Sequence, residues 1–257
     1  MTATVTTSRL GHVAEIRFGR PPHNFADVAL LKAIADAIEA ADADPEVRCM
    51  VLVSEGKVFC GGADLAGDDS VAGEEGMGAI GQFYVHAARM FRRAKPMVAA
   101  VQGAAIGAGL GLALAADFRV ASPGARFSSN FVRLGFHPGF AITRTLKRVV
   151  GEQRAGWMML SAERVKPEAA YAWGLVDRLA DEGDAAAEAH RMAAEIAANA
   201  PLALISVRAT WLGGLADEAV AATRHEHAEQ TKLKATEDYA EGVASVFERR
   251  EANFTGR

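Results

Sequence analysis

The chain has 257 residues, half of them hydrophobic, and a formal net charge of −4. That apolar content is enough for a large buried core and excludes an intrinsically disordered chain. The 28 basic residues are spread along the sequence rather than gathered in one stretch, which argues against a nucleic-acid-binding protein.

Neither the first residues nor the longest uncharged run has the pattern of a membrane or export segment. The N-terminus lacks the cationic start and apolar centre of a signal peptide, and Gln102 and four glycines interrupt residues 96–116. The two cysteines, Cys49 and Cys60, both lie in apolar runs, which predicts buried, reduced thiols. We therefore expect a soluble cytoplasmic protein that contacts no membrane.

The first half of the chain alternates between predicted strands and helices. Residues 13–18 alternate in polarity like a half-buried strand, and residues 26–43 carry apolar side chains at helical spacing. Two further strands are predicted at residues 49–53 and 97–101, each leading into a glycine-rich turn. This strand–turn–helix order predicts an α/β fold of stacked units.

The second half is helical. Pro167 and Pro201 stand where proline is favoured, in first helical turns. We predict a core over residues 1–195 and a helical oligomerisation region over residues 196–257, because the helices from Glu218 onward have apolar faces without an evident partner in the chain. The predicted helices are residues 153–161, 167–173, 185–198, 201–211, 218–230 and 240–251.

Two short turns carry the strongest functional signal. Gly61-Gly62-Ala63 and Gly107-Ala108-Gly109 each follow an apolar, strand-like run. Free backbone N–H groups held by rigid elements can stabilise the negative charge that develops on a carbonyl oxygen. The second turn also opens an apolar helix predicted at residues 110–116, whose N-terminal dipole favours negative charge. The pair therefore predicts an oxyanion hole.

At these turns the chain resembles the crotonase (enoyl-CoA hydratase/isomerase) superfamily. The resemblance implies a spiral ββα core with a C-terminal helical trimerisation region, and assembly as a homotrimer or a dimer of trimers. It also implies an acyl-CoA thioester substrate and no separate cofactor. Further matches in the same order are residues 20–25, 44–48, 96–103 and 174–177, with Asp238, Glu241, Gly242 and Phe247.

The resemblance implies roles for particular residues. The N–H groups of Ala63 and Ala108 would bind the thioester oxygen, and no metal is expected. The residues expected around the substrate are Gly62, Asp64, Leu65, Ala66, Gly107, Gly111, Asn130 and Phe131.

The sequence departs from the hydratase pattern at both of its acid/base positions. Hydratases of the superfamily place one glutamate where this chain has Gly111 and a second where it has Phe131. Neither glycine nor phenylalanine can transfer a proton. The departures predict a lyase or isomerase that is not an efficient hydratase.

Several replacements for the missing carboxylates stay open. His137 is either an acid/base near neutral pH or a histidine packed in a turn, and Asn130 can orient a substrate or water. Glu74 and Glu75 are either surrogate carboxylates or part of a solvated acidic loop. The alternatives to a lyase or isomerase are a CoA-thioester decarboxylase or hydrolase using His137, and a non-catalytic acyl-CoA binding protein.

Other classes fit less well. The glycines from Gly107 onward do not match a dinucleotide fingerprint, because Leu112 stands where a small residue is required. His225 and His227 are two residues apart and point to different sides of a helix, which argues against a metal site. Asp117, after the second turn's helix, is interpreted as structural.

Overall fold

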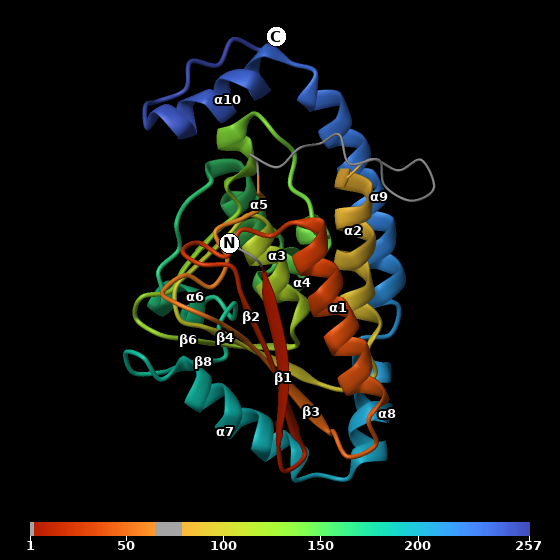
Figure 1. Cartoon of the computed structure of the whole chain (residues 1–257). Helices are drawn as coiled ribbons and strands as arrows, with labels where there is room; N and C mark the ends of the chain where they lie inside the picture. Colours follow the sequence, from red (N-terminus) through yellow and green to blue (C-terminus); the bar gives the residue numbers. More distant parts are fainter. Residues whose placement is uncertain (1–2, 65–78) are drawn as a thin grey trace.

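A six-stranded sheet runs through the core of the computed structural model, which describes residues 3–64 and 79–257 (Figure 1). Only the edge pair β1–β2 is antiparallel within the described sheet, and the other neighbours are parallel. The strands in spatial order are β1 (Thr4–Leu10), β2 (Val13–Gly19), β3 (Cys49–Ser54), β4 (Met97–Val101), β6 (Phe118–Ala121) and β8 (Arg178–Leu179).

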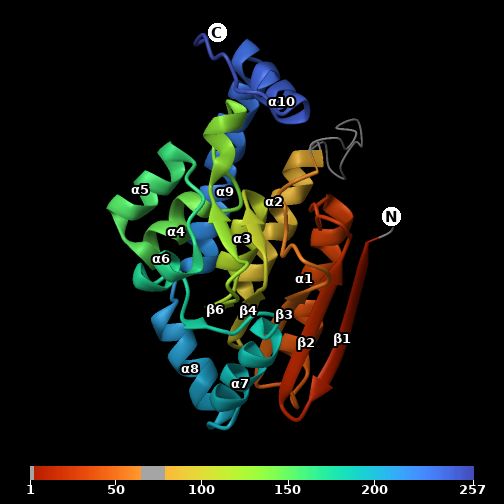
Figure 2. The same ribbon diagram turned by 90° about the vertical axis from the view of Figure 1, so that its left-hand side faces the viewer.

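The two faces of this sheet bury different sets of side chains. Val51 and Val53 of β3 face α7 (Ala185–Ala197), whereas Met50 and Leu52 face the main core. Alternation along a buried strand produces both faces, because successive side chains point in opposite directions. The main core is covered by α1 (Val28–Ala43), α2 (Ala79–Arg89) with the 3-10 turn η2 (Met90–Arg92), and α3 (Ala108–Ala115), while α7 lies on the opposite face (Figure 2).

A second, smaller sheet carries both glycine-rich turns. Its strands β5 (Ala104–Ile106) and β7 (Arg126–Ser128) are parallel. Single bridges extend this ladder from Ala105 to Cys60, and from Ala63 to Ala26. The 3-10 helix η3 (Asn130–Leu134) follows β7 directly, so residues from four distant segments of the sequence meet at one place.

Helices make up most of the remaining chain. Three of them, α4 (Ile142–Val150), α5 (Glu152–Ser161) and α6 (Pro167–Ala172), follow the second sheet. The chain then returns through α8 (Pro201–Trp211) and α9 (Leu215–Lys234) to α10 (Glu237–Glu248) near the C-terminus (Figure 1). The predicted boundary after residue 195 falls in the last turn of α7.

The expectation that the helices from Glu218 onward lack a partner within the chain is wrong for α9 and only partly wrong for α10, whose Val246 and Phe247 stay exposed. The face of α9 that includes Ala219 and Glu226 is buried against α2 and α4 of the same chain. Likewise α10 packs on η3, where a Cβ on Gly242 would lie 2.5 Å from the carbonyl carbon of Leu134. The cause is the length of α9, which brings the chain back across its own core.

Within the described residues, no helix is both long enough and apolar enough to cross a membrane.

Candidate oxyanion site

Hydrogen bonds between two distant segments place the glycine turns beside one another. The Cys60 N–H donates to Ala104 O at 2.9 Å, and the Ile106 N–H donates to Cys60 O at 3.0 Å. A Cβ on Gly109 would overlap that same Cys60 carbonyl oxygen. Glycine at this position therefore lets the start of α3 approach the first turn closely, as the two-turn prediction requires.

The Ala63 N–H is left available by the pairing of its neighbours. Ala26 N–H donates to Gly62 O at 2.8 Å, and Asp64 N–H donates to Ala26 O at 2.9 Å. This single parallel bridge is formed by Gly62 O and Asp64 N–H, the backbone groups on either side of Ala63. The N–H of Ala63 itself therefore points away from Ala26. In residues 3–64 and 79–257, no backbone carbonyl accepts a hydrogen bond from it.

Ala108 is the first residue of α3 and supplies the second donor. N–H groups in a first helical turn have no acceptor within the helix, and Gly107, the N-cap, provides no side chain to cap them. Gly107 has a φ of +54° and donates its own N–H to Ser128 O at 2.9 Å. The helix begins two residues earlier than predicted, so Ala108 lies at the positive end of its dipole.

Asn130 and Phe131 line this second turn. A Cβ built on Gly107 would lie 3.0 Å from Asn130 Oδ1 and 3.7 Å from the Phe131 ring. Phe131 is 8% exposed, so it presents an apolar ring and no proton-transfer group beside the turn. The structure thus brings together Gly107, Ala108, Asn130 and Phe131.

Phe140 occupies the space next to Gly111. A Cβ on Gly111 would overlap Phe140 Cβ and lie 2.5 Å from its Cγ, and the Phe140 side chain is fully buried. A carboxylate side chain at position 111 would therefore displace this ring. Phe140 was not predicted from the sequence, where the signal for it was the glycine at position 111, near the start of the predicted helix.

His137 faces the C-terminal helices. Its Nδ1 lies 2.8 Å from Pro138 O, and its ring is edge-on to that of His225 at 6.0 Å between centroids. Because a carbonyl oxygen only accepts, this contact places the proton on Nδ1 and leaves Nε2 unprotonated in the neutral ring. Within the described part of the chain, no hydrogen bond joins the His137 side chain to either turn, and its acid/base role stays a hypothesis.

The remaining predicted residues divide into two groups. Asp64, at the end of the first turn, forms an ion pair with Arg20 at 2.8 Å. Leu65, Ala66, Glu74 and Glu75 lie outside the described residues.

The cysteines do not add a nucleophile to the site. Both are free and buried, and burial raises the pKa of the Cys60 thiol to about 11 and that of Cys49 to about 12. Thiolate is the nucleophilic form, so both side chains stay unreactive near neutral pH. No cluster of three or more histidine, cysteine or acidic side chains able to hold a metal occurs in residues 3–64 and 79–257.

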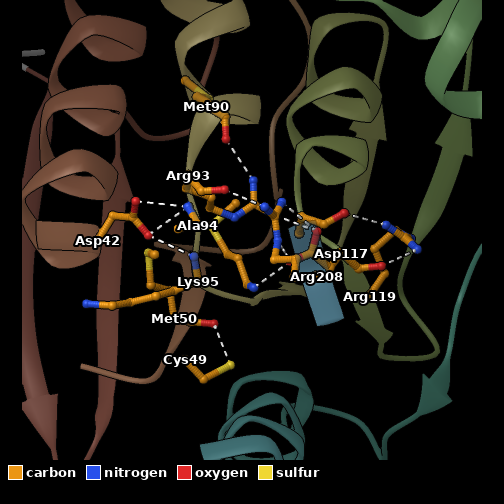
Figure 3. A network of polar contacts seen from close by, with 12 residues as sticks. Asp42, Cys49, Met50, Met90, Arg93, Ala94, Lys95, Asp117, Arg119 and Arg208 are labelled. Atoms are coloured by element: carbon orange, nitrogen blue, oxygen red, sulfur yellow. Dashed lines mark hydrogen bonds and ion pairs between the residues drawn. The ribbon is translucent and has the colours of Figure 1, made fainter. Parts of the chain in front are cut away.

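Buried charges gather at the opposite end of α3 (Figure 3). Arg208 of α8 donates to both carboxylate oxygens of Asp117 at 3.0 Å, and Arg93 pairs with the same group at 2.9 Å. Burial alone would raise the pKa of Asp117, but the two arginines outweigh it and hold that pKa below its ordinary value. Asp117 also accepts from Met97 N–H at 2.9 Å, which agrees with the structural role expected for it.

The parallel sheet, the small second sheet with its two glycine turns and the helical C-terminal region define a crotonase-fold α/β protein. The enoyl-CoA hydratase/isomerase family matches residues 9–257, and the chain belongs to that family. The mevalonyl-coenzyme A hydratase of Beauveria bassiana is 37% identical over 220 residues, covering 81% of this chain and 79% of the relative. The crotonyl-CoA hydratase of Syntrophomonas wolfei is 32% identical over 234 residues, covering 88% of each.

Solved structures show the same fold. An enoyl-CoA hydratase/isomerase from Pseudoalteromonas atlantica superimposes with a TM-score of 0.86 at 28% identity, over 98% of this chain and 99% of the other. The carnitinyl-CoA hydratase of Mycobacterium avium gives a TM-score of 0.86 at 29% identity, over 98% of each chain. The predicted fold class is confirmed.

Proposed function

We propose that the protein acts on an acyl-CoA thioester whose carbonyl oxygen accepts hydrogen bonds from the N–H groups of Ala63 and Ala108. The observation that carries this proposal is the juxtaposition of two turns whose donors lack backbone partners among the described residues. Removing one such donor from an oxyanion hole typically costs about 10²–10³-fold in rate. The pair therefore supplies a large part of the rate enhancement without any side chain.

The protein is proposed not to be an efficient hydratase. Adding water to a double bond requires proton transfers, and general acid/base groups contribute roughly 10²–10⁴-fold. The two positions where hydratases carry glutamates are proposed to be Gly111 and Phe131, and Phe140 fills the space beside the first. This proposed departure would separate the chain from a hydratase that uses two glutamates.

Reactions that pass through an enolate but need little help from a protein base fit the site best. In a decarboxylation, loss of CO₂ leaves the electron pair on carbon 2, and the thioester oxygen takes up the resulting charge. Slow double-bond isomerisation forms a similar enolate, in which carbon 2 loses a proton to solvent water and a proton is returned at carbon 4. The proposed activity is that of a lyase or isomerase on acyl-CoA thioesters.

His137 supports a second candidate, a decarboxylase or hydrolase in which this side chain acts as the acid/base group. The contact between its Nδ1 and Pro138 O fixes the tautomer and leaves Nε2 able to accept a proton. A non-catalytic acyl-CoA binding protein is the remaining alternative.

Turnover of crotonyl-CoA, followed by product analysis with malonyl-, β-keto- and dienoyl-CoA thioesters, tests these proposals. We expect crotonyl-CoA hydration at least ~10³-fold below that of a hydratase with both glutamates, as the loss of acid/base groups requires. We expect turnover of at least one other thioester class. An ordinary hydration rate would contradict the proposal, and binding without turnover of any thioester would favour the non-catalytic alternative.

A homotrimer or a dimer of trimers is proposed as the assembly. Large apolar side chains are exposed on the single chain, which predicts burial against other subunits. Sedimentation at micromolar concentration should give three or six protomers, and a stable, folded monomer would contradict the assignment. The exposed side chains include Trp157, Leu160, Leu202, Val207, Trp211, Val246 and Phe247.

A further inference from the structure

Phe140 lies one helical turn away from the Ala108 donor. Gly111 N–H donates to Gly107 O at 3.1 Å, which marks that turn, and the Phe140 side chain packs directly against Gly111. Three residues of α-helix rise about 4.5 Å. If the thioester oxygen is held at Ala108 N–H, the acyl group lies next to this first turn of α3, where Phe140 fills the space beside Gly111.

The backbone that presents Phe140 is unusual. Phe140 and Ala141 are consecutive non-glycine residues in the left-handed region, with φ of +63° and +56°. Such backbone persists only where surrounding contacts determine it. The Phe140 ring is also held edge-on to Phe83 of α2, with centroids 6.2 Å apart.

Glu226 of α9 supplies those contacts. Its Oε2 accepts from Ala141 N–H at 2.7 Å, and its Oε1 accepts from the Thr143 N–H at 3.0 Å and from Thr143 Oγ1 at 2.6 Å. Glu226 is fully buried, and its bond to Ala141 is shielded from water, whereas Thr143 is partly exposed. A second α9 side chain, Gln230, donates to His137 O at 2.8 Å and holds the other side of the same segment.

We propose that Phe140 is a specificity-determining residue that restricts the acyl group to unbranched chains at carbons 2 and 3, and that Glu226 is the residue that positions it. This inference rests on the proposed function. It names the substrate class as straight-chain acyl-CoA thioesters, because the filled space beside Gly111 leaves no room for a branch close to the carbonyl.

Calorimetric binding of butyryl-CoA and 3-methylbutanoyl-CoA tests the role of Phe140. Both thioesters are saturated, and they differ by one methyl group at carbon 3. We expect the wild type to bind butyryl-CoA about tenfold more tightly, and Phe140→Ala to bring the two affinities to within about twofold. Phe136→Ala is the matched control, since Phe136 is an equally large ring in the same segment that packs on Tyr239 of α10 instead.

The positioning role of Glu226 has its own readout. Glu226→Gln keeps the side-chain shape but cannot accept from all three donors, so its preference ratio should shift towards that of Phe140→Ala. In the Phe140→Ala background the same change should have no further effect on the ratio. A merely structural role would lower stability in both backgrounds and leave the ratio unchanged, which would overturn the role of Glu226.

The outcomes separate the two proposals. A wild type that binds neither thioester overturns the proposed function and this inference with it. A wild type that binds butyryl-CoA, with the same preference in wild type and Phe140→Ala, overturns the inference alone. If Phe140→Ala does not fold, the ratio of the affinities for the two thioesters is measured in Phe140→Leu instead. Leucine retains apolar bulk but leaves the space of the outer part of the ring empty.

Discussion

The two ends of α3 differ in the groups that they present: a backbone N–H donor at the start, and a cluster of buried charged side chains beyond the end. At its start, Ala108 offers a backbone donor, and no side chain caps the helix. Beyond its end, Asp117 is surrounded by Arg93 and Arg208, and Arg119 donates to the carbonyl oxygen of Ala116 at 2.9 Å (Figure 3). The buried charges at the second end join α8 to the sheet and have no role in the proposed chemistry.

Energetics explain why the first end is the informative one. A buried donor without a partner costs about 1–3 kcal/mol, so such groups are rare unless a ligand satisfies them. Ala108 is only 4% exposed, yet its N–H has no partner among the described residues. The functional signal is therefore an open backbone group rather than a reactive side chain.

Removing the charge at the far end of α3 should have the largest effect. Asp117→Ala leaves two buried arginines without their carboxylate, and breaking such a group costs about 3–5 kcal/mol of unfolding free energy. Urea denaturation measures this loss. Asp217→Ala, an exposed aspartate of α9, is the control and should stay within about 0.5 kcal/mol of the wild type. A loss below 1 kcal/mol at Asp117 would show that the cluster contributes little.

Removing the donor at the near end should slow the chemistry instead. Ala108→Pro deletes the N–H, and proline is tolerated at the first position of a helix. We expect kcat on the natural thioester to fall about 10²–10³-fold, equivalent to about 2.7–4 kcal/mol, with much of the CoA affinity retained. Ala63→Pro should behave alike.

Ala108→Gly keeps the N–H and serves as the control for that experiment. Folding of each variant is checked first by circular dichroism. A folded Ala108→Pro protein with full activity would mean that these turns do not hold the oxyanion.

A substitution at Gly111, in the middle of α3, should change thermal stability through side-chain volume. Gly111→Ala inserts a methyl group into Phe140, and overpacking of this kind costs about 1–3 kcal/mol, although alanine is the better helix former by about 1 kcal/mol. Thermal unfolding should show a lower Tm in the wild-type background and no penalty in the Phe140→Ala background. Gly156→Ala in α5, where a Cβ meets nothing within 4 Å, should raise the Tm slightly. Equal losses at both glycines would refute the packing argument.

The smallest expected effect is a dependence on pH. The folded-state pKa of Asp117 lies below its unfolded value of about 3.9, so the ionised group stabilises the fold above that pH. This stabilisation is lost as the pH falls through the lower, folded-state pKa. The difference in Tm between the wild type and Asp117→Asn should therefore shrink as the pH is lowered from 5 to 3, whereas a constant difference would exclude a titrating Asp117.

Local sequence signals predicted most of the helices and, among the described strands, β2, β3 and β4. The run that becomes β4 was predicted at residues 97–101 and matches its observed bounds, and α8 was predicted at residues 201–211, as observed. The edge strand β1 was not predicted, because its exposed, threonine-rich residues carry no apolar alternation. The helix α4 was also missed, since basic residues occupy much of its length.

Of the proposed site, the sequence predicted the backbone donors of the two turns but not the packing of Phe140 beside them. Glycine turns after apolar strands are visible in a sequence and pointed to a pair of backbone donors, which the resemblance placed at Ala63 and Ala108. The contact between Gly111 and Phe140 depends on two consecutive residues with left-handed backbone. Neither is a glycine, so the sequence does not indicate this conformation. Glu226, between two histidines on α9, was considered only as part of a metal motif, because no sequence pattern shows that a helix will return across the core and turn this carboxylate inward.

An oxyanion hole made of main-chain N–H groups has a consequence for how such a protein evolves. Every amino acid except proline carries the same donor, so most single substitutions at Ala63 or Ala108 leave the hydrogen bond in place. The surrounding side chains, by contrast, can be exchanged without removing either donor, and in this chain they include a glycine and two phenylalanines. Activation of the thioester can thus be inherited unchanged while the reaction that follows it diversifies within a lineage.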